Sequence, residues 1–343
     1  MSLTVFERTL GSLYGMATGD ALGVPSSFTT PEHIRETWGW IDTFYPPEKG
    51  HIFHDGLQAG EYTDDTEQAL ALANSFIRNK KVVPLDIVDE LLAWVERVKD
   101  KYASPLGPST ERALKAIKAG ASIKDSGRWG NTNGSAMRIS PLGIIHGLRG
   151  SSCEELAKDV HSTCIPTHNT NVCVSTAAAI AWGVAVCMRG ETDISKIVEE
   201  TIRASEVGKK YGYQIVSPRI AKRIEYIHDI VLGSSCPEQA MADIYAMFAG
   251  GDLAADSIPV AIGLFALGQG DPKRVNEYCV NFGGDCDTNA AMAGAMAGAY
   301  SGVDAVPLAW RETIESVNKV GMADYANGLI GLAPKWEIAE IDL

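Results

Sequence analysis

Several features that would place a chain in a specialised class are scarce in these 343 residues. The seven cysteines form no Cys-x-x-Cys pair and are odd in number, which argues against a disulfide framework or a zinc site and favours reduced thiols. Basic residues are outnumbered, with 30 Lys and Arg against 43 Asp and Glu, and the net charge of −13 argues against nucleic-acid binding. A basic partner or a cation held by an acidic site suits this charge better.

Signals for export or membrane insertion are also scarce. The N-terminal apolar run contains Glu7 and Arg8, so we do not expect a secretory signal peptide. The longest uncharged stretch, residues 169–188, carries Asn, Ser and Thr among many Ala residues and is at the short limit for a membrane span. We therefore expect a buried core helix there, no membrane association and a cytoplasmic location.

Alternating β-branched runs are nearly absent, while apolar residues recur at helical spacing along most of the chain. This pattern predicts an all-α fold. Because no linker, repeat or low-complexity tract interrupts it, we expect one domain over residues 1–343, with a monomer favoured. Helices are predicted near residues 3–18, 64–79, 84–98, 108–119, 152–162, 170–188, 193–206, 216–231, 237–249, 257–268, 272–281, 287–302, 308–319 and 322–332.

Two predicted helices and two loops differ from the rest in composition. Residues 170–188 and 287–300 hold rows of Ala and Gly, which let helix backbones approach closely and suit central helices. Residues 19–62 and 120–136 are rich in Gly, Pro, Asn, Ser, Thr and aromatics. Long irregular loops in a compact helical domain are usually functional, so we expect function there.

An acidic cluster opens each of two predicted helices near opposite ends of the chain. Residues 63–66 read Thr-Asp-Asp-Thr, with the first threonine in the N-cap position. Residues 283–288 read Gly-Gly-Asp-Cys-Asp-Thr, and the two glycines permit a sharp turn. Acids in a first helical turn are favoured by the helix dipole, so either cluster alone is explained as a cap.

The two clusters are more informative together. Each offers two carboxylates and a threonine hydroxyl with no neighbouring Lys or Arg, and four converging carboxylates would repel one another unless cations lay between them. Six hard oxygen donors suit Mg²⁺ or Mn²⁺ better than zinc, and two ions about 3.5–4 Å apart could share such a site. The second cluster also reads Asp-x-Asp, as in haloacid-dehalogenase phosphatases. We reject that reading because residues 275–282 have a helical pattern where that motif requires a strand.

In their order along the chain, these clusters and three further segments resemble the ADP-ribosylglycohydrolase family, which includes dinitrogenase-reductase-activating glycohydrolase. The similarity extends from about residue 10 to residue 302. Five segments carry it: GSLYGMATGDALGVP at 11–25, EYTDDTEQAL at 61–70, NTNGSAMRISPLG at 131–143, PTHNTNVCVSTAAA at 166–179 and GGDCDTNAAMAGAMAGAYSG at 283–302. One segment alone would be weak, whereas five in sequence argue strongly against a chance match.

The resemblance implies a single-domain orthogonal bundle of helices with two metal ions at the base of a cleft. The implied cofactor is Mg²⁺, with Mn²⁺ as the alternative, and the implied reaction is hydrolysis of an α-linked bond at C1″ of ADP-ribose. The residues that match the family's metal ligands are Thr63, Asp64, Asp65, Asp285, Asp287 and Thr288. Such a cleavage develops positive charge at the anomeric carbon and needs a positioned water, which metal-bound Asp64 or Asp65 could orient or deprotonate. These two aspartates are therefore the candidate catalytic residues.

The other matched segments supply candidate substrate contacts. Asn133, Gly134 and Ser135 match the family's stretch beside the diphosphate and distal ribose, where consecutive backbone N–H groups can bind an anion; a plain turn with a serine cap is the alternative. His168 matches a family histidine near the substrate, although a lone histidine is more often structural. Asp20 lies near a predicted helix end and is expected to support the metal or the ribose.

Three further interpretations concern the surroundings of this site. Arg138 is expected to be a buried ion-pair partner, and Gly107 is a weaker candidate for the substrate pocket. Several aromatics lie in or beside loops and could stack on an adenine, but aromatics in a bundle belong more often to the core. They are Trp38, Trp40, Phe53, Trp129, Tyr211 and Tyr213.

One family feature is missing. Many members carry a glutamate just after the GDALG-x-P element, proposed to act in substrate gating or as the general base, and Ser27 stands at that place. The next acid is Glu32. Either a metal-bound aspartate takes the role of the base, Asp55 substitutes for it, or activity is reduced. The departure leaves the expected metal ligands intact.

Three functions are therefore open. The first is a magnesium-dependent hydrolase that releases ADP-ribose from an ADP-ribosylated protein, with arginine as the acceptor. The second is a hydrolase of a small N-ribosyl compound, such as a nucleoside or a nucleotide-like molecule. The third, motivated by Ser27, is a non-catalytic ADP-ribose-binding homologue.

Overall fold

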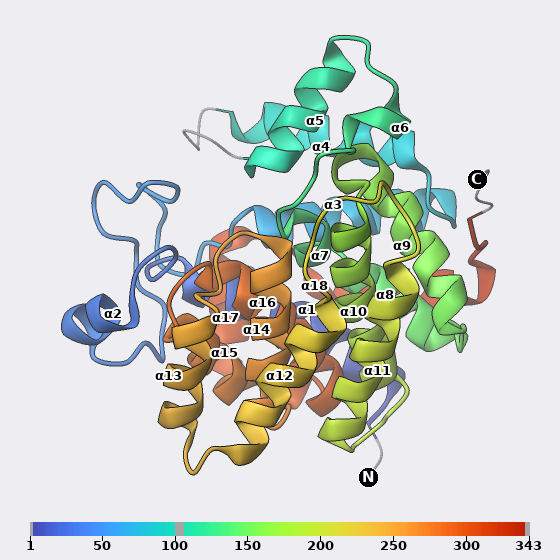
Figure 1. Cartoon of the computed structure of the whole chain (residues 1–343). Coiled ribbons are helices and arrows are strands. Elements are labelled where there is room, and N and C mark those ends of the chain that lie inside the picture. The colour runs from blue at the N-terminus through green and yellow to red at the C-terminus, as the bar shows by residue number, and fades with distance from the viewer. Residues whose placement is uncertain (1–2, 100–105, 340–343) are drawn as a thin grey trace.

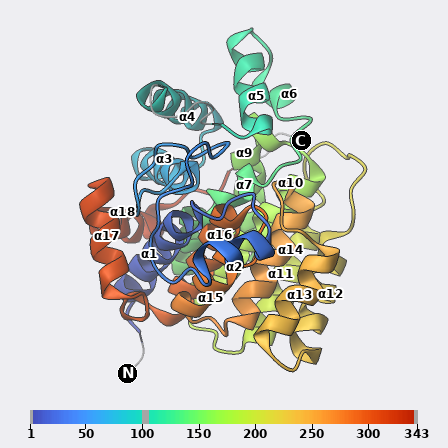
Figure 2. The ribbon, with the colours of Figure 1, turned by 90° about the vertical axis from the view of Figure 1, so that its left-hand side faces the viewer.

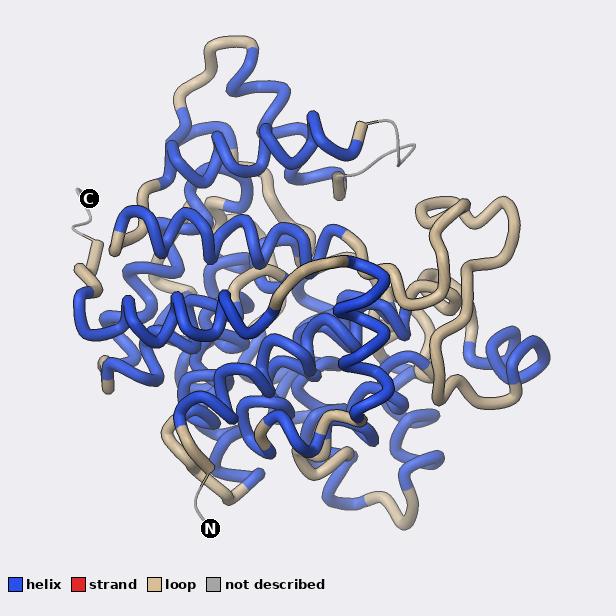
Figure 3. The backbone as a smooth tube through the Cα atoms, turned by 180° about the vertical axis from the view of Figure 1, so that it is seen from behind, coloured by secondary structure: helices blue, strands red, loops and turns tan. Residues whose placement is uncertain are grey.

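The computed structural model describes residues 3–99 and 106–339, and its helices and turns over these ranges confirm the predicted all-α fold (Figures 1 and 3). Backbone pairing between the described segments outside helices is limited to isolated bridges such as Thr29 with Gly284. The helices in chain order are α1 (Val5–Gly23), α2 (Pro31–Trp38), α3 (Asp64–Asn79), α4 (Pro84–Val98), α5 (Pro108–Lys118), α6 (Ile123–Ser126), α7 (Gly134–Met137), α8 (Ser140–Arg149), α9 (Cys153–His168), α10 (Asn171–Met188), α11 (Ile194–Gly208), α12 (Ile220–Gly233), α13 (Pro237–Met247), α14 (Ala254–Leu267), α15 (Pro272–Val280), α16 (Cys286–Ser301), α17 (Leu308–Asn318) and α18 (Met322–Leu332), with 3-10 turns η1 (Val303–Ala305) and η2 (Ala333–Lys335).

Four helices, α2, α6, α7 and α8, were not predicted from the sequence. The helix α2 begins with a Thr30 cap and a proline in its first turn, start signals that the surrounding polar loop obscured. The helix α8 contains Pro141 and two glycines, which lower helix propensity. Its proline occupies the first turn, where a missing N–H is harmless, and a carbon added at Gly143 would lie 2.4 Å from the Ala181 carbonyl oxygen of α10. Tertiary packing therefore accounts for a helix that propensity disfavours.

The helices α1 and α16 pack backbone against backbone. Glycines recur every four residues along α1 and form one row on the face that meets α16. A Cβ added at any of them would lie only 2.1–2.4 Å from backbone atoms of the partner: Gly11 from Gly298, Gly15 from Gly294, Gly19 from Ala290 and Gly23 from Asp287. We call this row and its partner atoms the glycine seam. It brings the C-terminal end of α1 against the first turn of α16.

The helix α10 lies at the centre of the molecule, between α8, α9 and α11 (Figure 1). It is long and apolar enough to cross a membrane by length and composition, yet its whole 18-residue window is buried inside the protein. The predicted core helix is thereby confirmed. All seven cysteines are free thiols, as expected, and six of them are buried.

Two peripheral parts flank the starts of α3 and α16. The helices α4, α5 and α6 form the upper part of the molecule in Figure 1, and α2 with the loop that follows it extends to the left. After a quarter turn, α2 lies in front of α1 and α16 (Figure 2). The starts of α3 and α16 thus lie where these two peripheral parts meet the helical body.

Candidate active site

A cleft at the N-terminal ends of α3 and α16 contains both acidic clusters. All six residues predicted as metal ligands line it, as do Asn133 and Gly134. Gly107, a weaker candidate, also lines it. The sequence did not single out eight further lining residues: Phe28, His54, Leu106, Pro108, Thr110, Thr132, Met137 and Asp252.

The first turn of α3 is held by a carboxylate from α1. Asp20 is fully buried, and its Oδ1 accepts hydrogen bonds from the backbone N–H and the hydroxyl of Thr63 at 2.9 and 2.8 Å. Its Oδ2 accepts from the N–H and hydroxyl of Thr66 at 3.0 and 2.6 Å. Asp20 thus caps α3 from outside the helix and fixes the turn that carries Asp64 and Asp65. Its oxygens face this turn, and its support of the metal or the ribose stays a prediction.

The first turn of α16 follows two glycines in the left-handed region. Gly283 and Gly284 have φ values of +91° and +74°, and a Cβ at Gly284 would lie 2.1 Å from the Ala249 carbonyl oxygen. Only glycine fits this turn, which is the sharp bend that the sequence predicted. Asp285 then takes the N-cap position, and its Oδ2 accepts a hydrogen bond from Nδ2 of Asn133 at 2.7 Å.

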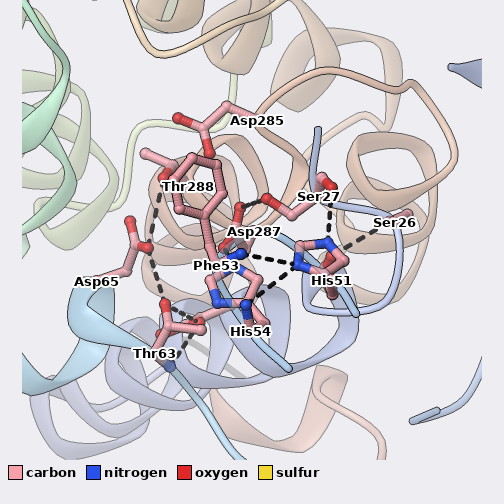
Figure 4. Close-up of polar contacts among 12 residues, drawn as sticks. Ser26, Ser27, His51, Phe53, His54, Thr63, Asp65, Asp285, Asp287 and Thr288 are labelled. Atoms are coloured by element: carbon pink, nitrogen blue, oxygen red, sulfur yellow. Dashed lines mark hydrogen bonds and ion pairs between the residues drawn. The ribbon is translucent and has the colours of Figure 1, made fainter. Parts of the chain in front are cut away.

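The two clusters meet at Asp65. The hydroxyl of Thr288 donates to Oδ2 of Asp65 at 3.4 Å, across 223 positions of sequence, and the hydroxyl of Thr63 lies 3.1 Å from the same oxygen (Figure 4). Oδ1 of Asp65 is buried and accepts no hydrogen bond from the residues that the structure describes. A buried carboxylate oxygen without a donor is costly unless a cation or a ligand approaches it.

Burial and mutual repulsion raise the pKa values of most carboxyl groups in this site. Burial, followed by the charges of Asp287 and Asp20, raises the pKa of Asp64 to about 7. Burial also raises the pKa of Asp20 to about 6, and burial together with neighbouring carboxylates raises the pKa values of Asp65 and Asp285 well above the ordinary range. In the absence of cations the site therefore retains protons near neutral pH.

Asp287 differs from the other acids because both of its oxygens have donors. Oδ1 accepts from the Ser27 hydroxyl at 2.7 Å, and Oδ2 lies 2.8 Å from Nε2 of His54 (Figure 4). Burial raises the pKa of Asp287, but the hydrogen bond and the charge of His54 outweigh it and hold this pKa below the usual value. Burial lowers the pKa of His54, but Asp287 more than offsets this, so the pKa of the imidazole is raised.

His54 is held in place by a second histidine. Nδ1 of His51 accepts the backbone N–H groups of Phe53 and His54 at 3.3 and 3.1 Å, and its Nε2 lies 3.0 Å from the Ser27 carbonyl oxygen. The two imidazoles stack with centroids 5.0 Å apart. His54 was not predicted from the sequence, although its place three residues after His51 in a loop was a usable signal.

The residues present fit divalent cations by donor chemistry. The cleft offers hard carboxylate and hydroxyl oxygens, one of them without a hydrogen bond, in a setting where like charges repel. As the side chains stand, no three His, Cys, Asp or Glu of the described residues are grouped closely enough to hold one ion. Asp285 and Asp287 are instead engaged by Asn133, Ser27 and His54. Cation binding would therefore require these carboxylates to turn toward Asp65.

Two predicted substrate contacts lie behind the cleft wall. His168 is fully buried, with Nε2 3.1 Å from the Thr132 hydroxyl and Nδ1 2.8 Å from that of Thr167. A Cβ at Gly134 would lie 3.0 Å from its ring, so the histidine backs this part of the wall. Burial, followed by the charge of Arg138, lowers the pKa of His168 well below the usual value. Ser135 is buried too, and substrate contact by either residue stays a prediction.

Arg138 is buried as predicted, but its predicted ion pair is not found among the described residues. Its guanidinium donates to Oε1 of Gln68 at 2.5 Å and to the Thr167 hydroxyl at 2.6 Å rather than to a carboxylate. Burial lowers its pKa to about 10. It links α3, α7 and α9 around the site.

Comparisons with known proteins agree on one family. The sequence model of "ADP-ribosylglycohydrolase" matches residues 1–338. The chain is 34% identical to the Escherichia coli K12 protein "Uncharacterized protein YegU" over 94% of this chain and 96% of that one. It is 25% identical to "ADP-ribosyl-[dinitrogen reductase] glycohydrolase" of Rhodospirillum rubrum, over 96% and 98%, and 24% identical to human "ADP-ribosylhydrolase ARH3", over 90% and 89%. A solved structure titled "ADP-ribosylglycohydrolase-related protein complex" aligns with a TM-score of 0.72 and 24% identity, covering 96% and 99%, which confirms the predicted fold type.

Proposed function

The chain belongs to the ADP-ribosylglycohydrolase family and is a glycohydrolase, and from this premise we propose that it cleaves the α-glycosidic bond between C1″ of ADP-ribose and a protein side chain, with arginine as the acceptor and Mg²⁺ as the cofactor. One observation carries the proposal. Two acidic helix starts from opposite ends of the sequence converge on Asp65, one oxygen of which is buried without a hydrogen bond.

Thr63, Asp64 and Asp65 would hold the cations from the α3 side, and Asp285, Asp287 and Thr288 from the α16 side. Bound divalent cations supply the positive charge that lowers the pKa of a water and fixes the ribose hydroxyls. Asp64 or Asp65 would orient the attacking water and take its proton, since both carboxylates line the cleft and Asp20 fixes their helical turn. The water oxygen bonds to C1″ as the bond to the acceptor breaks, and the acceptor leaves with the proton. Positioning and electrostatics then supply most of the rate.

The part of the cleft wall formed by Asn133 and Gly134 suits the ADP part of the substrate. Asn133 donates to Asp285, and the short helix α7 begins directly after it with Gly134 at the cleft. Because glycine has no side chain, a diphosphate oxygen can approach the backbone here. His168 supports this glycine from behind.

Two observations favour a protein-linked substrate. The names of the Rhodospirillum rubrum and human relatives describe hydrolysis of ADP-ribosyl groups, in one case on dinitrogen reductase. The net charge of −13 and Asp252 in the cleft suit a cationic acceptor such as arginine.

The direct test is release of ADP-ribose from a protein ADP-ribosylated on arginine, measured with Mg²⁺ and with EDTA. We expect release only with the cation and none from Asp65→Asn. A parallel incubation with nucleosides distinguishes the other hydrolase: consumption of nucleosides alone would contradict the proposal. Tight binding of ADP-ribose without turnover under saturating Mg²⁺ would instead identify a non-catalytic binder.

A further inference from the structure

Two aromatic side chains form an exposed surface at the Asp287 end of the cleft. Phe28 and Phe53 both line the cleft and remain 41% and 40% exposed. Their ring centroids lie 4.8 Å apart with an angle of 55° between the planes, so together they form an angled apolar surface. We call this pair the aromatic wall. Exposed aromatics that adjoin buried carboxylates in one cleft are poorly explained as core residues.

Phe28 is held in a costly backbone conformation. Its φ of +59° is rare for a bulky residue that is not glycine. Its backbone N–H donates to the carbonyl oxygen of Gly284 at 2.6 Å, next to the turn that opens α16. Strain of this kind persists where the surroundings impose it and is concentrated at functional sites. The strained backbone directs this ring toward the cleft.

The neighbours of both rings contact the same carboxylate. Ser27, before Phe28, and His54, after Phe53, occupy the two oxygens of Asp287. His51 then ties the two segments together through the Ser27 carbonyl oxygen. Figure 4 shows this network around Asp287, with Phe53 beside it. Each ring of the aromatic wall is therefore one residue away from a side chain that holds Asp287.

The position of this wall decides which part of the substrate it can meet. Gly134 and Asn133 belong to the wall near Asp285, where the proposed function places the diphosphate. The proposed function puts the ribose over the carboxylates, and C1″ then lies on the side of the ribose away from the diphosphate. We therefore place the acceptor toward Asp287, whose oxygens are held by the neighbours of Phe28 and Phe53. An adenine, separated from C1″ by the diphosphate and a second ribose, would lie at the opposite end.

We propose that Phe28 and Phe53 bind the leaving group and select a planar cation, the guanidinium of an ADP-ribosylated arginine. This rests on the proposed function. A guanidinium stacks on aromatic faces through its planar, weakly hydrated charge, whereas a serine hydroxyl gains nothing from such a surface. Asp55, which follows His54 in the sequence, is exposed and adds a negative charge to this loop.

The test compares Phe53→Leu, which keeps an apolar side chain but removes the ring, with Phe53→Trp, which keeps a ring. Tyr226→Leu is the matched control, because Tyr226 is an exposed ring on α12 outside the cleft. Each variant is assayed on ADP-ribosyl-arginine and ADP-ribosyl-serine peptides with Mg²⁺, and its affinity for free ADP-ribose is measured by calorimetry.

We expect Phe53→Leu to lower kcat/KM for the arginine peptide about tenfold, mainly through KM, with less than about a twofold change for the serine peptide and for ADP-ribose affinity. Phe53→Trp and Tyr226→Leu retain the arginine preference. Equal losses on both peptides, or a matching loss of ADP-ribose affinity, would show that the ring contacts the ADP-ribose part and would overturn the proposal. So would an unchanged preference. A wild-type protein inactive on every ADP-ribosyl peptide would instead overturn the proposed function, and this inference with it.

Discussion

The glycine seam and the carboxylates at the base of the cleft are both largely buried, yet they are built in opposite ways. We call these carboxylates, those of Asp20, Asp64, Asp65, Asp285 and Asp287, the floor of the cleft. In the seam, backbone packs on backbone: Gly11, Gly15 and Gly19 leave no room for a side-chain carbon against α16. In the cleft floor, carboxylates face one another, and Oδ1 of Asp65 accepts no hydrogen bond from a described residue. The seam follows the rules of stable packing, and the floor departs from them.

The two regions are joined end to end. A Cβ at Gly23, the last glycine of the row, would lie 2.4 Å from the Cα of Asp287, and Asp20 on the same helix caps α3. The seam therefore sets where the acids lie. We infer that the close packing of α1 on α16 holds mutually repelling carboxylates near one another. Their repulsion lowers the stability of the protein, and cation binding would offset this loss.

The largest effect is expected in the floor. Asp287→Ala removes a proposed ligand and the partner of Ser27 and His54. We expect turnover of ADP-ribosyl-arginine protein to fall by at least about 10³-fold and Mn²⁺ binding in calorimetry to weaken sharply. Circular dichroism is expected to retain the helical spectrum, since alanine keeps the backbone atoms of residue 287 that face Gly23 in the seam. Full activity in this variant would refute the assignment of the site.

The next largest effect is expected in the seam. A methyl group at Gly298 would lie 1.9 Å from the Gly11 carbonyl oxygen, so Gly298→Ala must force the two helices apart. We expect it to lower the free energy of unfolding by about 3 kcal/mol, measured by urea denaturation. The control is Gly331→Ala on α18, where nothing lies within 4 Å and alanine is expected to stabilise the helix by about 0.5 kcal/mol. Equal free energies of unfolding for the two variants would show that the seam can accommodate a methyl group, and would contradict the close packing of α1 on α16.

A pH dependence of stability follows from the raised pKa values in the floor. The pKa values of Asp64, about 7, and Asp20, about 6, lie above that of an unfolded aspartic acid, so the folded protein binds more protons between about pH 4 and 7. The stability of the protein in EDTA should therefore fall as the pH rises from 5 to 8, by about 2 kcal/mol. Added Mg²⁺ should remove most of this loss. The measurement is the Tm across pH with and without the cation, and a Tm in EDTA that rises toward pH 8 would contradict it.

The smallest effect is expected at Asp65, where one substitution should raise stability and abolish activity. Asp65→Asn removes one of the repelling charges while keeping the shape of the side chain. We expect the variant in EDTA to be more stable than the wild type by about 1 kcal/mol at pH 8, and to lose hydrolytic activity. Thermal unfolding and the turnover assay measured on one preparation decide this. If the variant were less stable, the repulsion inferred for the floor would be absent.

The sequence predicted much of the fold and the core of the candidate site. Helical periodicity and small-residue composition located α3, α10 and α16, and the capping pattern placed Asp64 and Asp65 in a first turn. It missed α8, because tertiary packing against α10 overrides the low propensity of proline and glycine there. It also missed the row of glycines on α1, whose meaning depends on which helix it faces.

The unpredicted parts of the site come from loops. His54 and Phe28 belong to no periodic pattern, and their places are set by contacts with Asp287 and Gly284 that lie more than two hundred positions away. The spacing of residues within a short stretch of sequence cannot predict contacts over such distances along the chain. The hydrogen bond between Ser27 and Asp287 likewise became visible only in the structure, since the sequence showed only that Ser27 stands where many family members have a glutamate.

Anomalous scattering from crystals of the protein grown with Mn²⁺ would show directly whether the two acidic helix starts hold a pair of cations. We expect two peaks about 3.5–4 Å apart, enclosed by Asp65 on one side and by Asp285 and Asp287 on the other. The metal site would be contradicted by an anomalous map that shows no peaks there at saturating Mn²⁺ while Asp287 keeps its hydrogen bonds to Ser27 and His54.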